Sequence, residues 1–294
     1  MGLISSWQEP IGVSIEQYRR AFHTGVKTGD LFWAGYSAAQ LVARRLIRGD
    51  PLEEVWRETE EFAAFSRRTR YGLAVDFILS QQRYIASIQG SKEASSFLAT
   101  FDEPAFEARL GPDRISTMVC WYWILKLAAC FANGDYQGAL AASRKAEVVL
   151  WGSWGQIQLL DYHYFTALTL TAIGPPALAG REQWRDQLGA HLDELQHWAA
   201  HCPQTFLDKA LLVSAEIARV DGRDLEAMRL YEDAIRVARE NGAARHEAIA
   251  NELAGKFYLQ RAIPRAALAC LEEARACYLR WGALTSAQRL DATI

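Results

Sequence analysis

Two histidines and a cysteine lie close together in the stretch LQHWAAHCPQTFLDKA, residues 195–210. His197 and His201 are four residues apart, so on a helix they share one face, as half of a zinc site would require. Cys202 follows directly, but the nearest further ligand, His191, lies six residues before His197 and points well round the helix. The spacing therefore favours a helix end that carries histidines over a metal site.

Other patterns that could support chemistry are incomplete. The triplet AGK at 254–256 lacks the first glycine of a phosphate-binding loop. In LWGSWGQ, Trp151 stands where a serine-nucleophile elbow needs glycine, and no strand precedes the motif. We interpret this motif as a helix end in which Trp151 and Trp154 serve as packing residues. Adjacent acidic pairs such as Glu272-Glu273 diverge on a helix and are typical of solvated faces. We therefore expect no catalytic residue, cofactor or metal.

The composition is that of an ordinary globular protein. Half of the 294 residues are hydrophobic, 23% are charged and the formal net charge is −3, which gives no electrostatic reason to expect nucleic acid. Five cysteines cannot all pair, and four of them lie in apolar helical runs, where free cysteine acts as a small hydrophobe. No apolar run reaches the ~18 uncharged residues of a membrane span. We expect a cytoplasmic protein without membrane or nucleic-acid partners.

Six arginines form two trios, 44, 45, 48 and 67, 68, 70, and each trio precedes a break that contains glycine. Positive charge complements the carbonyl end of a helix, which explains both trios as helix ends. The alternative is a docking patch for an acidic partner.

Nearly all of the chain consists of helical stretches of about 15–20 residues, separated by short breaks that contain Gly or Pro. The first begins at Ser14, in a sequence like a capping box, and ends at Gly29; the second ends at Gly49. The least regular part, residues 90–111, is expected to be a loop with one short helix. The other helices are expected near 52–70, 73–89, 113–132, 135–150, 156–173, 179–201, 204–220, 223–241, 244–261, 263–281 and 283–292.

Three segments can be superposed as repeats: FANGDYQGALAASRKAEVV, ARVDGRDLEAMRLYEDAIRVA and LQRAIPRAALACLEEARACY. A small residue marks the turn in each copy, and two alanines recur after it. The matched sets are Gly134, Gly222 and Ala262; Ala139, Ala227 and Ala267; Ala146, Ala234 and Ala274. Alanines seven residues apart let the helices of a pair approach closely. The last two copies are 40 residues apart and the first two 88, which leaves room for a degenerate copy between them.

These features predict an all-α fold, a tetratricopeptide-like α-solenoid of about 12–14 helices in antiparallel pairs that form a right-handed superhelix. We expect one solenoid over residues 1–294, with degenerate pairs over 14–110 and better-formed repeats over 111–294.

The C-terminal two-fifths of the chain resembles the helical-repeat region of large bacterial signalling ATPases. The matching segments are HWAAHCPQTF, the run from LLVSAEIARVDGRDLEAM to ELAGKFYLQR, and ACYLRWGA, with weaker similarity back to about Gly25. In that family a kinase-like module and an AAA/STAND-type ATPase precede the helices, and a GAF sensor and histidine kinase often follow them. The basic continuation after RWGA and both preceding modules are missing from this sequence, so it is an excised domain or a stand-alone relative.

The resemblance assigns structural roles around the first motif. Trp198, Cys202, Pro203 and Phe206 are family positions, whereas neither histidine is required. Proline at 203 ends the helix, and Trp198 and Phe206 are expected to pack across the corner.

Three functions follow as hypotheses. The first is a non-catalytic scaffold that binds a protein or neighbouring domains and relays conformation within a bacterial signal-transduction ATPase or kinase. The alternative is a sensor that binds a small molecule in an aromatic-lined superhelix groove. An enzyme on a helical scaffold is the third, and no inward carboxylate pair supports it. The candidate groove residues are Trp121, Trp123, Tyr162, His163 and Tyr164.

Overall fold

The computed structural model describes residues 2–69, 72–111, 114–175 and 180–293, and none of these residues lies in a strand. Within them one short 3-10 helix, η1 (Leu150–Ser153), follows α9, and the α-helices are α1 (Gly2–Gln8), α2 (Ile11–Thr28), α3 (Leu31–Arg48), α4 (Leu52–Arg68), α5 (Gly72–Gln89), α6 (Lys92–Thr100), α7 (Glu103–Ala108), α8 (Ser116–Ala132), α9 (Tyr136–Val148), α10 (Gln158–Ile173), α11 (Arg181–His201), α12 (Pro203–Val220), α13 (Asp224–Glu240), α14 (Ala244–Gln260), α15 (Pro264–Trp281) and α16 (Leu284–Asp291).

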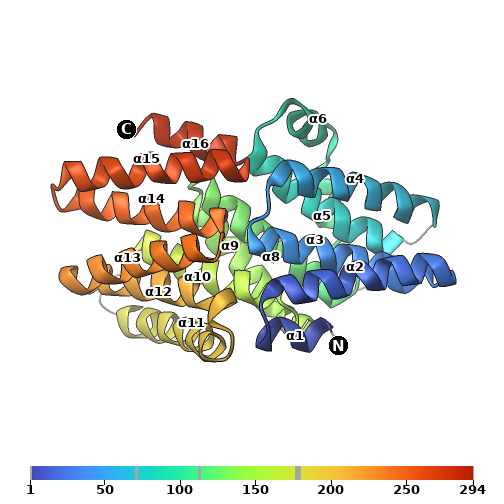
Figure 1. Ribbon diagram of the computed structural model, residues 1–294, viewed down its shortest axis with the longest axis horizontal. Helices are drawn as coiled ribbons and strands as arrows, with labels where there is room; N and C mark the ends of the chain where they lie inside the picture. Colours follow the sequence, from blue (N-terminus) through green and yellow to red (C-terminus); the bar gives the residue numbers. More distant parts are fainter. Residues whose placement is uncertain (1, 70–71, 112–113, 176–179, 294) are drawn as a thin grey trace.

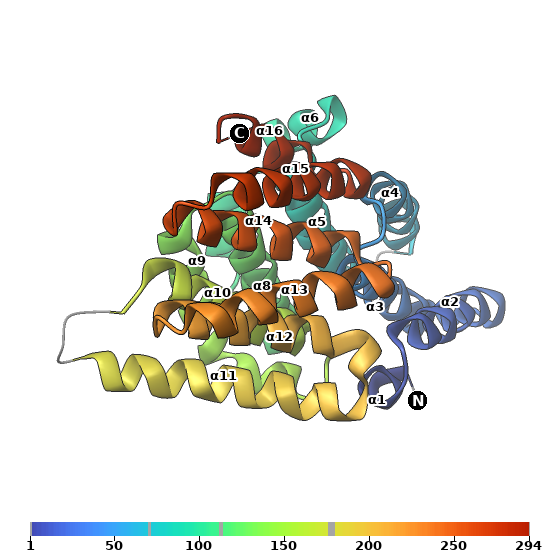
Figure 2. The same ribbon diagram turned by 60° about the vertical axis from the view of Figure 1, so that its left-hand side comes forward.

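Neighbouring helices pack in pairs, most extensively α2 with α3, α8 with α9, α12 with α13 and α14 with α15. Figure 2 shows the C-terminal pairs in successive layers, from α11 at the bottom of the view to α15 near the top. Figure 1 shows the N-terminal helices α2 to α5 beside these layers. The predicted all-α solenoid of helix pairs is confirmed.

The repeat alignment correctly locates three tight turns. Gly134 and Gly222 have φ of 78° and 75°, and the third matched residue, Ala262, has φ of 56°. This left-handed conformation suits glycine, because a Cβ there approaches the following carbonyl oxygen. Ala262 is the one non-glycine residue with positive φ in the described part of the chain.

The repeated alanines lie where the helices of each pair meet. All six, at 139, 146, 227, 234, 267 and 274, are fully buried. Larger side chains pack between successive pairs: the rings of Tyr231 on α13 and Phe257 on α14 lie 5.4 Å apart, and both are buried. The predicted role of alanine in close packing is therefore confirmed.

Two local expectations about helices are wrong. The helix α2 begins at Ile11 rather than at Ser14, whose buried hydroxyl donates back to the Ile11 carbonyl. Pro10, whose ring fixes φ, is the residue that directly precedes the helix. Residues 92–108 form two short helices, α6 and α7, because Ser91 and Asp102 each accept a hydrogen bond from a backbone N–H of the following turn.

Two C-terminal helices contact helices of the N-terminal part of the chain. Arg245 on α14 donates to the Leu46 carbonyl at the end of α3, at 3.1 Å. Thr285 on α16 donates to the Ile88 carbonyl at the end of α5, at 2.7 Å. Both carbonyls belong to the last turn of a helix, where the regular partner four residues on is missing; the Leu46 carbonyl also accepts from the Gly49 N–H, at 3.2 Å. The C-terminal helices α14 and α16 therefore cap α3 and α5.

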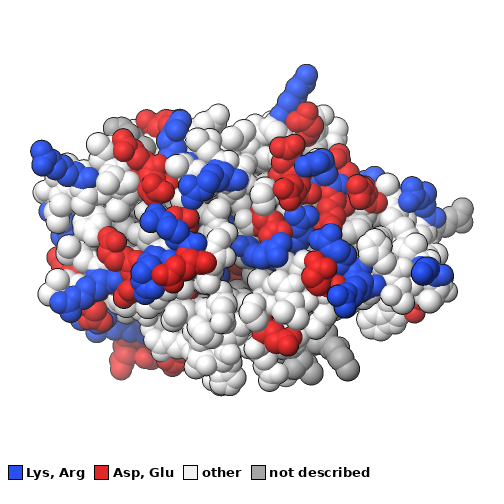
Figure 3. Space-filling model, in the orientation of Figure 1, with Lys and Arg blue, Asp and Glu red and all other residues white. Residues whose placement is uncertain are grey.

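No helix in the described part of the chain combines the length and the apolarity that crossing a membrane requires. Positive and negative side chains are interspersed on the face that Figure 3 shows, and few charged side chains appear at its lower centre, where Figure 1 places α1.

Candidate functional site

The predicted groove residues are not gathered on one surface. Trp121 and Tyr164 lie in the interior and are 1% and 0% exposed. Trp121 packs on the ring of Phe77, and Tyr164 packs on Phe165. These two side chains are part of the core of the solenoid and do not line a groove.

The other three residues point to different neighbours. Trp123 is buried with Lys145 Nζ 4.0 Å from its ring centroid. Tyr162 lines a cleft between α9 and α11. His163 contacts Trp198, with ring centroids 5.4 Å apart. The structure brings only Tyr162 and His163 close together, at 5.1 Å between ring centroids.

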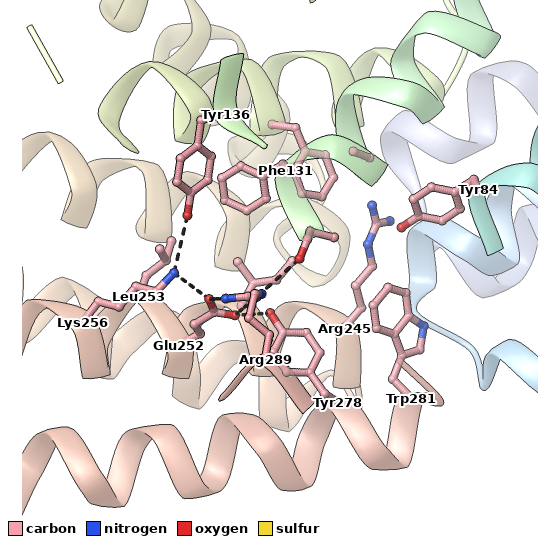
Figure 4. Close-up of a pocket in the computed structure, with 14 residues that line it drawn as sticks. Tyr84, Phe131, Tyr136, Arg245, Glu252, Leu253, Lys256, Tyr278, Trp281 and Arg289 are labelled. Carbon is pink, nitrogen blue, oxygen red and sulfur yellow. Dashed lines mark hydrogen bonds and ion pairs between the residues drawn. The ribbon is translucent and has the colours of Figure 1, made fainter. Parts of the chain in front are cut away.

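The inner face of the solenoid is filled by side chains from α5, α8, α9, α10, α14, α15 and α16 (Figure 4). The space left between them has a volume of about 20 Å³. A single water molecule needs roughly 10–15 Å³ on the same measure, so this cavity admits a water and excludes an organic ligand.

An ion-pair network borders this inner cavity, centred on Glu252 (Figure 4). Its carboxylate accepts from Arg289 at 2.7 and 3.0 Å, from Lys256 at 2.6 Å and from the Tyr278 hydroxyl at 2.7 Å. Burial disfavours the charged form, but Arg289 and Lys256 outweigh it and lower the pKa of Glu252 to about 2. The carboxylate is thus fully paired, and the network joins α14 to α15 and α16.

Arg245 is the second buried charge near the centre. It donates to Asp161 on α10 at 3.1 Å, and its guanidinium lies 4.9 Å from the Phe165 ring centroid and 5.7 Å from that of Trp281. Its neighbour His246 contacts the Ile47 carbonyl through Nε2 at 2.9 Å. These groups are committed to the contact between α14, α10 and α3, so we interpret them as structural.

The corner between α11 and α12 forms as predicted. Pro203 is the first residue of α12, Cys202 is buried, and the rings of Trp198 and Phe206 lie 5.8 Å apart. Trp7 of α1 adds a third ring, 4.6 Å from Trp198. The corner is a packing motif that also anchors the N-terminal helix.

The histidines of the opening motif share a face, with ring centroids 4.9 Å apart, and both are exposed. No third ligand joins them within the described part of the chain. His191 instead faces His163, with 3.0 Å between the two Nδ1 atoms. Burial, and then His191, lower the pKa of His163 to about 3, and burial lowers that of His191 to about 4. This pair is therefore uncharged at neutral pH.

One group of possible metal ligands occurs among the described residues: Glu247, Glu273 and Cys277, within 4.8 Å of one another. Arg239 and Arg280 already bind the Glu247 carboxylate, at 2.7 and 3.0 Å. Burial, and then Glu247, raise the pKa of the Cys277 thiol to about 12, so the thiolate is disfavoured. We interpret this group as an ion-pair network.

The first arginine trio is committed to the fold. Arg44 is fully buried, and Arg45 pairs with Asp50, Glu54 and Glu58 at 2.6–3.0 Å. The second trio differs, because Arg67 and Arg68 are exposed at the end of α4 and Arg70 lies outside the described residues. Arg44 and Arg45 are therefore not accessible to an acidic partner, and the partly exposed Arg48 is bound to Asp50 at 2.7 Å.

Hydrogen bonds to other helices hold the segment around η1 on two sides. At one edge the Thr117 hydroxyl donates to the Gly152 carbonyl at 2.5 Å. A Cβ on Gly152 would lie 2.8 Å from the Cβ of Ser116, so only glycine allows this approach to α8. At the other edge the Gln156 amide donates to the Tyr36 hydroxyl at 3.2 Å, and the Trp7 indole donates to the Gly155 carbonyl at 3.1 Å.

The two tryptophans of this segment do not pack as expected from the sequence. Trp151 is 61% exposed and Trp154 is 77% exposed. The hydrogen bonds that join this segment to α1, α3 and α8 are made by the Gly152 and Gly155 carbonyls and by Gln156, and none of them uses the side chain of Trp151 or Trp154. The packing role expected for both is therefore wrong.

More large apolar side chains are exposed beside this segment. Trp33, 56% exposed, packs edge-on to Tyr36, the residue that Gln156 contacts. Ile115 precedes Ser116, which adjoins Gly152. We call this set the tryptophan surface; its members, each more than half exposed, are Phe32, Trp33, Ile115, Trp151 and Trp154. It is the candidate functional site.

Comparisons with known proteins identify no relative. No protein-family model matches the chain, and no curated protein matches it.

Proposed function

We propose that the chain is a non-catalytic helical-repeat module that binds another protein, or a neighbouring domain of its own chain, through the tryptophan surface. The observation that supports this most is the exposure of Trp151 and Trp154 on a backbone held at both edges. A buried tryptophan removes 150–250 Å² from water, and tryptophan dominates the binding energy of many interfaces.

The positioning of these side chains also supports a docking role. A flexible loop would lose conformational entropy on binding, whereas this segment is already fixed by Gly152 and Gln156. Two exposed tryptophans on a fixed backbone can therefore serve as anchors at little entropic cost.

The resemblance to bacterial signalling ATPases supports a specific setting for such a module. In that setting the partner is the ATPase or output module of a signalling protein, and the solenoid relays conformation between them. The contacts of α14 and α16 with α3 and α5 join the C-terminal helices to the N-terminal part of the chain, as a relay requires.

The experiment compares co-purification from native cells of the wild-type chain, the W151S/W154S variant and the control variant L225S. Leu225 is 63% exposed on α13 and lies outside the tryptophan surface, so the control removes a comparable exposed apolar side chain. We expect a partner that co-purifies with the wild type and L225S and is lost with W151S/W154S. Equal recovery with all three would contradict the proposal.

The size of the native polypeptide decides the setting. An antibody against this segment that detects a chain far larger than 33.0 kDa, with ATPase peptides, would place it inside one signalling protein. A species at 33.0 kDa would make it a free-standing adaptor.

A further inference from the structure

A cleft lies between α9 and α11, with α10 as its floor and a volume of about 570 Å³. Small-molecule sites usually span about 300–1,000 Å³, so this cleft is large enough for a metabolite, unlike the inner cavity. It is separate from the tryptophan surface, and none of the residues of that surface lines it.

Each of the three helices presents one stripe of side chains to the cleft, at the spacing of three or four residues that places them on one helical face. The stripes are Leu140, Ser143, Arg144 and Glu147 from α9; Tyr162, Thr166, Leu170 and Ile173 from α10; and Gln183, Trp184, Gln187, Ala190 and His191 from α11.

The floor offers apolar and aromatic surface whose polar atoms are already bonded. The hydroxyls of Ser143 and Thr166 lie 2.8 Å apart and bond to each other. The Trp184 indole donates to the Leu170 carbonyl at 3.3 Å. The Trp184 and Tyr162 side chains are 7% and 4% exposed, and both line this floor. A flat, apolar group matches this floor.

The rim on α9 carries one charge of each sign. Arg144 and Glu147 are exposed, three residues apart on the same helical face, and both line the cleft. Neither side chain makes an ion pair with any residue that the structure describes. Their formal charges cancel, so the rim matches a ligand that carries a carboxylate and an ammonium group close together.

We propose that this cleft binds a free α-amino acid with an aromatic side chain. Its carboxylate binds Arg144, its ammonium group binds Glu147, and its ring lies against Tyr162 and Trp184. The proposal goes beyond the docking function and does not depend on it, because it rests on different helices and different residues.

Isothermal titration calorimetry tests the proposal on the full chain, with L-phenylalanine, L-tyrosine and L-tryptophan as probes. Two analogues remove one charge each: the methyl ester of L-phenylalanine lacks the carboxylate, and N-acetyl-L-phenylalanine lacks the ammonium. We expect R144Q and E147Q each to raise the dissociation constant for L-phenylalanine by about tenfold, the effect of one charge-assisted contact.

The analogues distinguish direct contacts from indirect effects. Binding of the ester should be as weak with R144Q as with the wild type, and binding of the N-acetyl analogue should not change with E147Q. R229Q is the matched control, since Arg229 is also exposed and lies on α13 outside the cleft. Its affinity for L-phenylalanine should equal that of the wild type.

Three outcomes would overturn the proposal: no heat from any of the three amino acids at millimolar concentration, equal affinity in R144Q, E147Q and the wild type, or binding of a neutral sugar such as glucose without binding of the amino acids. Loss of the protein partner in W151S/W154S with amino-acid binding intact would show that the two sites are independent.

Discussion

Ala262 occupies a position at which the other two repeat copies have glycine, Gly134 and Gly222. Its φ of 56° is left-handed, which costs an alanine roughly 1–2 kcal/mol relative to glycine. We expect Ala262→Gly to raise the free energy of unfolding by about 0.5–1 kcal/mol, because the larger unfolded-state entropy of glycine offsets part of the gain. Urea denaturation followed by circular dichroism measures the change.

The equivalent glycine provides the control. Gly222→Ala should lower the free energy of unfolding by about 1 kcal/mol, since Gly222 has φ of 75°. A destabilised Ala262→Gly variant would show that the third turn is not strained.

The paired histidines give the protein a pH-dependent stability. Burial lowers the pKa values of His163 and His191 to about 3 and 4, below the ordinary value of 6.5, so the unfolded chain binds more protons between these limits. The stability they contribute is present above pH 6.5 and is lost as the pH falls. We expect the free energy of unfolding to drop between pH 7 and pH 5, a window above the titration of most carboxylates.

Variants isolate this contribution from that of His246, whose pKa burial also lowers. His163→Asn combined with His191→Asn should reduce the drop between pH 7 and pH 5, measured by urea denaturation at both values. His197→Asn, at an exposed position, should leave the drop unchanged. If the free energy of unfolding drops equally in the wild type, the double variant and His197→Asn, the two buried histidines are not the source of the pH dependence.

At the scale of elements, the alanine positions of the repeat determine how closely helices pack. Ala139 is fully buried against α8, whereas Ala141, two residues later on α9, is exposed. We expect Ala139→Leu to lower the free energy of unfolding by about 1–3 kcal/mol, because three extra carbon atoms must fit between packed helices. Ala141→Leu should change it by less than about 0.5 kcal/mol. If thermal or urea denaturation shows equal destabilisation by Ala139→Leu and Ala141→Leu, then Ala139 is not on the packed face of α9.

The sequence was sufficient to predict this level of structure. Repeated alanines and the small turn residues at 134, 222 and 262 indicated the helix pairs, because their roles depend on neighbours close in the chain. The corner at Trp198 and Phe206 followed from the family resemblance and from Pro203.

The candidate site could not be predicted in the same way. The sequence indicated that Trp151 and Trp154 are packing residues, because tryptophan is usually buried. Their exposure instead depends on contacts of Gly152 and Gln156 with helices distant in sequence. Two of the candidate groove residues, Trp121 and Tyr164, lie in the core because they pack against Phe77 and His246, which are remote in sequence. The two glycines of LWGSWGQ, at 152 and 155, were the available signal for a backbone that approaches another helix.

At the scale of the whole molecule, one buried arginine joins distant parts of the chain. Arg245 connects α14 to the Leu46 carbonyl of α3 and to Asp161 of α10. We expect Arg245→Met to lower the free energy of unfolding by about 3–5 kcal/mol, because it leaves the buried Asp161 carboxylate without its cation. Urea denaturation followed by both circular dichroism and tryptophan fluorescence measures the loss.

A second substitution tests the cause. Asp161→Asn in the Arg245→Met background removes the unpaired charge, so the double variant should be more stable than Arg245→Met alone. If the double variant is the less stable of the two, the unpaired carboxylate is not the source of the loss.

The central claim is that the tryptophan surface contacts another protein. The most direct measurement replaces Trp154 with the photoreactive residue p-benzoylphenylalanine and irradiates living cells, with the same replacement at Leu225 as the control; both positions are exposed, by 77% and 63%. The account predicts a discrete cross-linked protein at position 154 that is absent at position 225, or a cross-link within one longer chain to a neighbouring domain. The same pattern at both positions, or no cross-link at 154, would contradict it.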